Sequence, residues 1–117
     1  LPSQAGRLVL SILVGVNDYI NGMSTATFLA GLASHCDAMR AAGFPLAICT
    51  LTPTLLGGAW LSWRTAVNTE LRLWTTGGSV ASGIHADAIC DFAADPIMGP
   101  EKAGAWHDTC PVTLVSP

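Results

Sequence analysis

A glycine, an asparagine and an aspartate stand close together at the end of an apolar run. The run spans residues 7–16, and Gly15, Asn17 and Asp18 lie at or just after its end. A glycine lets the backbone N–H come close to a substrate, and an asparagine amide two residues later adds a neutral donor. Two convergent donors stabilise the oxyanion that forms during acyl transfer. The motif therefore predicts an oxyanion-binding site; a turn in which Asp18 helps to cap the next segment is the structural alternative.

The segments that must position this motif predict an α/β fold. Three apolar runs lack polar alternation, which is typical of strands buried in a parallel sheet, at residues 7–16, 44–53 and 84–93. Amphipathic helices are predicted between them, at residues 25–43 and about 59–74. Alternating strands and helices indicate a parallel sheet with right-handed crossovers.

Sites in open parallel sheets form just beyond the carboxyl ends of the strands. The Gly15–Asp18 motif, Thr52 and Asp95 follow the three predicted strands at such ends. We therefore expect these residues to lie at one edge of the sheet.

Both predicted helices have a recognisable end or face. Ser24 or Thr25 is the expected N-cap of the first helix, and Gly43 follows its end. One face of the second helix carries an apolar stripe of Trp60, Trp63, Val67, Leu71 and Trp74. We expect this stripe to pack in a core or an interface rather than to stack on a ligand.

This order of segments resembles the SGNH (GDSL-type) hydrolases, a family of serine esterases and lipases. The resemblance runs from Leu8 to Pro96 and is most specific at Gly15-x-Asn17-Asp18, which matches the family block whose Asn is an oxyanion-hole donor. It implies a flavodoxin-like, three-layer α/β/α fold and a small carboxylic ester as substrate. It also implies that Gly15 and Asn17 act as the oxyanion donors.

The chain departs from the family at both ends. No Gly-Asp-Ser block, which carries the nucleophilic serine in the family, occurs in the sequence, and the second oxyanion glycine also has no match. Where the family has Asp-x-x-His before a proline, Asp108 stands at the position of the Asp and Pro111 at that of the His; the neighbouring His107 is a candidate base. We therefore expect residues 1–117 to form one incomplete domain, without the first strands and the last helix, and to show weak or no turnover.

Other candidate nucleophiles and bases are weaker. His35 is expected on the solvent-facing side of its helix and His85 at the amino end of its strand, away from the site. Ser79 and Ser82 lie in a glycine-rich segment without the strand-to-helix elbow that exposes a nucleophile. Among the cysteines, Cys110 alone is near the expected corner of the site.

The cysteines do not predict a metal site. Cys36, Cys49, Cys90 and Cys110 form no C-x-x-C pair and have no His at metal-ligand spacing. The first three are expected to behave as small buried hydrophobes. The total of four cysteines permits disulfides without implying them, so the sequence does not decide whether the protein belongs to an oxidising compartment. We expect no cofactor.

The composition bears on partners. Only five basic and eight acidic residues must cover a 117-residue domain, which predicts apolar surface covered by a second copy of the chain or by a segment missing from it. The five basic residues form no cluster, which argues against nucleic acid. No apolar run approaches the ~18 residues of a membrane span, and residues 1–7 do not read as a signal peptide. A non-catalytic, self-associating or partner-binding module is therefore the alternative to an esterase.

Overall fold

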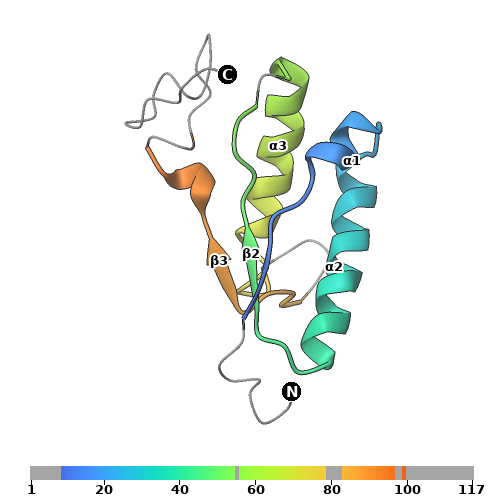
Figure 1. The fold of residues 1–117 in the computed structure, drawn as a ribbon, viewed down its shortest axis with the longest axis vertical. Coiled ribbons are helices and arrows are strands. Elements are labelled where there is room, and N and C mark those ends of the chain that lie inside the picture. The colour runs from blue at the N-terminus through green and yellow to red at the C-terminus, as the bar shows by residue number, and fades with distance from the viewer. Residues whose placement is uncertain (1–8, 55, 79–82, 97–98, 100–117) are drawn as a thin grey trace, which may run out of the picture.

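The computed structural model describes residues 9–54, 56–78, 83–96 and 99, and its helices and strands alternate along the chain (Figure 1). In chain order the elements are β1 (Leu10–Ile12), α1 (Val16–Ile20), α2 (Thr25–Ala41), β2 (Leu46–Cys49), α3 (Gly58–Leu71), β3 (Ala88–Cys90) and a 3₁₀ helix (Phe92–Ala94). The predicted α/β class is confirmed at this level.

The three strands form one parallel sheet in the order β1-β2-β3. Ile12, Ile48 and Ile89 are register partners across the sheet. Since α2 connects β1 to β2 and α3 connects β2 to β3, each parallel pair is joined by a helical crossover, as predicted from the alternation of apolar runs.

A hydrophobic core lies between the sheet and the helices α2 and α3. Trp60 and Trp74 are its largest members, and both are almost completely buried. The predicted tryptophan stripe therefore packs in the core, with Trp63 partly buried beside it. In Figure 1, α3 lies behind β2 and no described helix lies in front of the strands. The described part thus has a sheet and one helix layer.

Helix α2 begins and ends where the sequence predicted. The Ser24 hydroxyl accepts a hydrogen bond from the Thr27 N–H at 3.2 Å and caps the helix. At the other end, Gly43 has a φ of +96°, a left-handed conformation that favours glycine after a helix. Phe28, Leu32 and Cys36 are buried on the face toward the core.

The predicted strands were too long. Of the run 7–16, the structure describes residues 9–16, and of these Leu10–Ile12 form a strand; Val16 already belongs to helix α1, which the sequence did not predict. Likewise, 44–53 shortens to Leu46–Cys49, and 84–93 shortens to Ala88–Cys90. Only β2 is buried along its whole length, because it lies between the two other strands; β1 and β3 are partly exposed.

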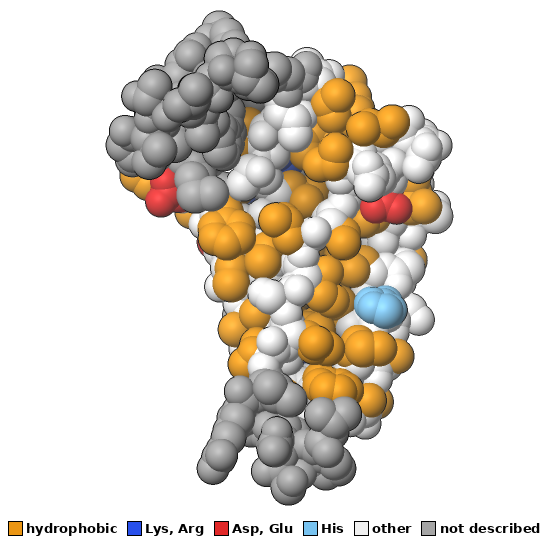
Figure 2. All heavy atoms as spheres, viewed as in Figure 1, with side chains coloured by type: hydrophobic (Ala, Val, Ile, Leu, Met, Phe, Trp, Pro, Cys, Tyr) orange, Lys and Arg blue, Asp and Glu red, His pale blue; other side chains and the backbone are white. Residues whose placement is uncertain are grey.

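The side of the sheet away from the core is made of small side chains. Because side chains alternate along a strand, the neighbours of the core residues Leu10, Ile12, Ile48 and Ile89 point to the opposite side. We call this side the open face, and it consists of Ser11, Ala47, Cys49, Ala88 and Cys90, flanked by Val9 and Leu13. The face turned toward the viewer in Figure 2 shows hydrophobic side chains along the middle of the molecule.

An ion pair fastens the amino ends of the strands to α2. The Arg40 guanidinium lies 3.0 Å from the Asp87 carboxylate and also donates to the Ile84 carbonyl at 2.8 Å. Asp87 in turn accepts a hydrogen bond from the Leu46 N–H at 2.8 Å. One carboxylate therefore links α2, the start of β2 and the segment that leads into β3.

Asp87→Asn is expected to make the free energy of unfolding depend less steeply on pH in acid. The hydrogen bond from Arg40, and then that from the Leu46 N–H, lowers the pKa of Asp87 in the folded protein. Its stabilisation is therefore fully present above the unfolded-state pKa of about 4 and is lost as pH falls through the lower folded-state pKa. Urea unfolding followed by tryptophan fluorescence between about pH 6 and pH 2 measures this slope. Equal slopes for wild type and variant would contradict the expectation.

Candidate functional site

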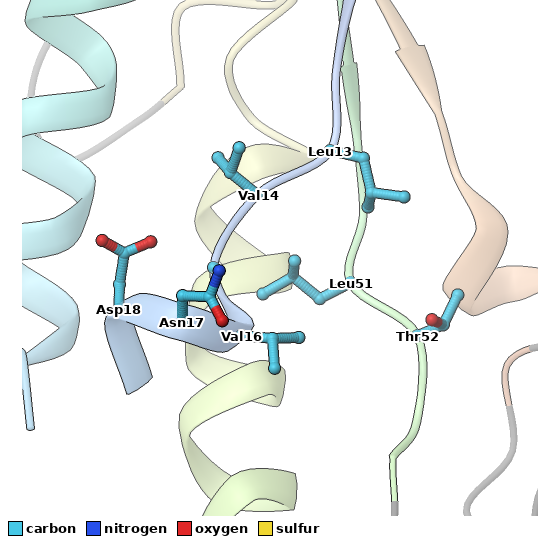
Figure 3. A pocket seen from close by; sticks show the side chains of 8 residues that line it. Leu13, Val14, Val16, Asn17, Asp18, Leu51 and Thr52 are labelled. Carbon is cyan, nitrogen blue, oxygen red and sulfur yellow. The ribbon is translucent and has the colours of Figure 1, made fainter. Parts of the chain in front are cut away.

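A pocket of about 260 Å³ lies at the carboxyl ends of β1 and β2. Figure 3 shows the residues that line it: Leu13, Val14, Gly15, Val16, Asn17, Asp18, Leu51 and Thr52. The predicted oxyanion motif and Thr52 thus meet at one edge of the sheet. Aliphatic side chains form most of the wall, and Asn17, Asp18 and Thr52 supply its polar side chains.

Gly15 forms the tight turn from β1 into α1. Its φ of +141° lies in a region that side chains with a Cβ rarely adopt. A Cβ at this position would also meet the Leu51 side chain at 3.0 Å and the Phe28 ring at 3.5 Å. The backbone conformation therefore favours glycine, and a Cβ here would also be in tight contact with Leu51.

Asn17 and Asp18 lie in the first turn of α1, which the Gly15 backbone begins. Asn17 is exposed, and its side-chain amide makes no hydrogen bond with a described residue. In Figure 3 this amide points toward the Leu51 side of the pocket, whereas the Asp18 carboxylate turns away from Leu51. Gly15 is the N-cap of α1 and Ser24 that of α2, and the Asp18 side chain makes no hydrogen bond with a described residue.

The segment after β2 is held by a buried clamp from α3. The Asn68 side chain accepts a hydrogen bond from the Leu51 N–H at 2.7 Å and donates to the Leu51 carbonyl at 2.9 Å. Arg64 donates to the same carbonyl at 3.2 Å. Both side chains belong to buried residues. The clamp fixes the backbone of the residue that packs on Gly15, so it sets one wall of the pocket.

A second set of polar side chains fixes the end of β3. Arg72 donates to the two Asp91 carboxylate oxygens at 2.8 and 3.0 Å, and the Thr50 hydroxyl donates to Asp91 at 3.0 Å. Thr50 accepts a hydrogen bond from the Ala93 N–H at 2.9 Å. The hydrogen bond from Arg72 is the main reason that the pKa of Asp91 lies below its ordinary value. Asp91 is thus a charged structural link, already engaged on both oxygens.

Sequence reasoning placed Gly15 and Asn17 at the site but missed Leu51 and the clamp that holds it. A usable signal was present, because Arg64, Asn68 and Arg72 recur every four residues and so share one face of α3. Polar side chains at this spacing on the face that also buries Val67 and Leu71 need partners. The Leu51 backbone supplies them for Arg64 and Asn68, and the Asp91 carboxylate supplies them for Arg72.

The structure brings no histidine to the pocket within the described residues. His35 is exposed on α2, as predicted. His85 is buried before β3, where its Nδ1 lies 2.8 Å from Asp37 and its ring contacts Trp74 edge-on. The candidate base His107 and the candidate triad residue Asp108 lie outside the described residues.

The described serines also lie elsewhere. Ser24 caps α2, Ser11 belongs to β1, and Ser34 and Ser62 are exposed on α2 and α3. Of the residues that line the pocket, Thr52 alone carries a hydroxyl group. Three further candidates, Ser79, Ser82 and Cys110, lie outside the described part of the chain.

Comparison with known proteins adds no relative: no family model, curated protein or solved structure matches the chain. Among the described residues, no helix is both long and apolar enough to cross a membrane. The same residues contain no group of three or more His, Cys, Asp or Glu side chains that could hold a metal ion.

Asn68→Ala is expected to destabilise the fold and loosen the pocket wall. The variant leaves the buried Leu51 N–H without its acceptor, and an unsatisfied buried group costs about 1–3 kcal/mol. Urea unfolding followed by tryptophan fluorescence measures the loss. Thr69→Ala, one position along the same helix and exposed, is the matched control. An equal loss in both variants would show that the clamp is not the cause.

Proposed function

We propose that this chain is part of an SGNH-type ester hydrolase in which Gly15 and Asn17 stabilise the oxyanion. The observation that carries the proposal is the Asn17 amide, which has no described hydrogen-bond partner and faces a mostly aliphatic pocket. The pocket lies at the carboxyl ends of parallel strands, where ligands of α/β sheets bind. The flavodoxin-like, three-layer arrangement, with a helix layer on the open face, is part of this proposal.

The proposed chemistry uses these groups in distinct roles. The aliphatic wall binds the acyl chain of the ester, and the carbonyl oxygen accepts hydrogen bonds from the Asn17 amide and the Gly15 N–H. As a nucleophile attacks the carbonyl carbon, negative charge develops on this oxygen, and the bonds to it strengthen. His107 is the proposed base, and Asp108 orients it. No serine lines the pocket among the described residues, so we expect weak turnover from this chain.

Asn17→Ala is expected to lower the enzymatic hydrolysis of p-nitrophenyl acetate and butyrate. Loss of one oxyanion donor costs roughly 10²–10³-fold in kcat. Asn21→Ala is the matched control, because Asn21 is exposed at the other end of α1 and does not line the pocket. A rate that falls equally in both variants, or that Asn17→Ala leaves unchanged, would contradict the assignment of Asn17.

Weak turnover calls for a readout that does not need a nucleophile. Addition of ethyl butyrate to ¹⁵N-labelled protein is expected to shift the side-chain amide resonance of Asn17 and to leave that of Asn21 in place. Absence of both hydrolysis and this shift would overturn the proposal as a whole, since it would show that no ester reaches the Asn17 amide.

The open face supports a second candidate function, self-association. Val9 and Leu13 at its margin are 63% and 55% exposed, and none of its residues is charged. Two copies of an uncharged apolar face can meet without repulsion or unpaired buried charge. We therefore propose a second copy of this chain as the partner.

Ala88→Lys is expected to weaken this association. Ala88 is exposed on β3, and a lysine there would place like charges against each other in a pair of facing sheets. Sedimentation velocity over a concentration series measures the monomer–dimer equilibrium. Ala30→Lys, on the exposed side of α2, is the control and should associate like wild type. A wild-type chain that stays monomeric at every concentration would exclude this function.

A further inference from the structure

Two cysteines that are far apart in the sequence lie side by side on the open face. Cys49 ends β2 and Cys90 ends β3, and the two are register partners in the parallel sheet. Their neighbours Ile48 and Ile89 belong to the core side, so both thiols point to the open face. The Cys90 thiol is close enough to Cys49 to raise the pKa of the Cys49 thiol.

The surroundings of this pair are apolar and uncharged. Cys49 is buried, whereas Cys90 is partly exposed and gives access from solvent. On the other side of β2, Ser11 of β1 is the register partner of Ala47 and lies on the same face. Burial, followed by the neighbouring Cys90 thiol, raises the pKa of the Cys49 thiol. The strands that carry the two thiols hold them next to each other.

We propose that Cys49 and Cys90 form a two-coordinate binding site for a soft monovalent metal ion, copper(I). Thiolate sulfur selects soft ions, and copper(I) is stable with two sulfur ligands in a nearly linear arrangement. Structural zinc requires four ligands, and the described residues place no third His, Cys, Asp or Glu with this pair. The proposal stands apart from ester hydrolysis, because the site uses none of the pocket residues.

The binding step releases two protons. It reads Cu⁺ + 2 RSH → [Cu(SR)₂]⁻ + 2 H⁺, in which each thiol loses its proton, each sulfur donates an electron pair to the metal, and no group is oxidised or reduced. Because protons compete with copper for both sulfurs, affinity is expected to fall as pH is lowered. A single net negative charge remains, next to the partly exposed Cys90 rather than in the closed core.

Anaerobic titration of the full chain with copper(I), in competition with the chelator bicinchoninate, tests the site. We expect one copper(I) ion per chain, and a loss of affinity of at least 100-fold in both Cys49→Ser and Cys90→Ser. Cys36→Ala and Cys110→Ser are the controls and should bind like wild type. Cys36 is fully buried in α2, where burial raises the pKa of its thiol to about 11.

Three results would overturn the proposal: full affinity in either serine variant, loss of binding in Cys110→Ser, or half a copper ion per chain, which would indicate a site shared between two copies. Circular dichroism checks that each variant is folded. X-ray absorption spectroscopy of the copper-loaded wild-type chain tests the site without any variant. It should show two sulfur ligands on copper. More than two ligands, or a nitrogen ligand, would contradict the site.

Discussion

The backbone of Leu51 is the point on which the site depends. β2 ends at Cys49, and the Thr50 N–H still donates to the Cys90 carbonyl at 3.1 Å, but the backbone of Leu51 has no neighbouring strand as partner. The Asn68 side chain takes over this role, since its oxygen and nitrogen bind the N–H and the carbonyl of Leu51 at 2.7 and 2.9 Å. A side-chain amide suits this role, because its oxygen accepts while its nitrogen donates. α3 thereby fixes the course of the chain where the pocket forms.

The other parts of the site follow from that fixed segment. The Leu51 side chain lies 3.0 Å from the place that a Cβ of residue 15 would occupy, so glycine allows the chain after β1 to pass close to it. β1 ends at Ile12, and the turn at Gly15, with its φ of +141°, leads directly into α1. α1 then sets the direction of the Asn17 amide. A packing contact between segments far apart in the chain therefore decides where the candidate oxyanion donor lies.

Signals from neighbouring residues predicted much of the fold, whereas features that depend on contacts between distant segments were not predicted. Ser24 and Gly43 marked the ends of α2 because capping depends on neighbouring residues. Gly15 and Asn17 were placed at the pocket because a parallel sheet gathers the carboxyl ends of its strands at one edge. The early end of β1 and the clamp on Leu51 were missed, because both depend on contacts between segments that only the folded chain brings together.

The hydrogen bonds at this edge of the sheet separate structural polar groups from available ones. Asn68 and Thr50 each bind partners that stabilise the end of a strand, and Asp91 is held by Arg72. Asn17 and Thr52, by contrast, line the pocket and make no side-chain hydrogen bond with a described residue. A chain with so few charged residues uses its polar side chains mainly to join elements, which makes those left unpaired at a pocket the best candidates for contact with a ligand. On this ground Asn17, rather than the better-buried polar residues around it, carries the functional proposal.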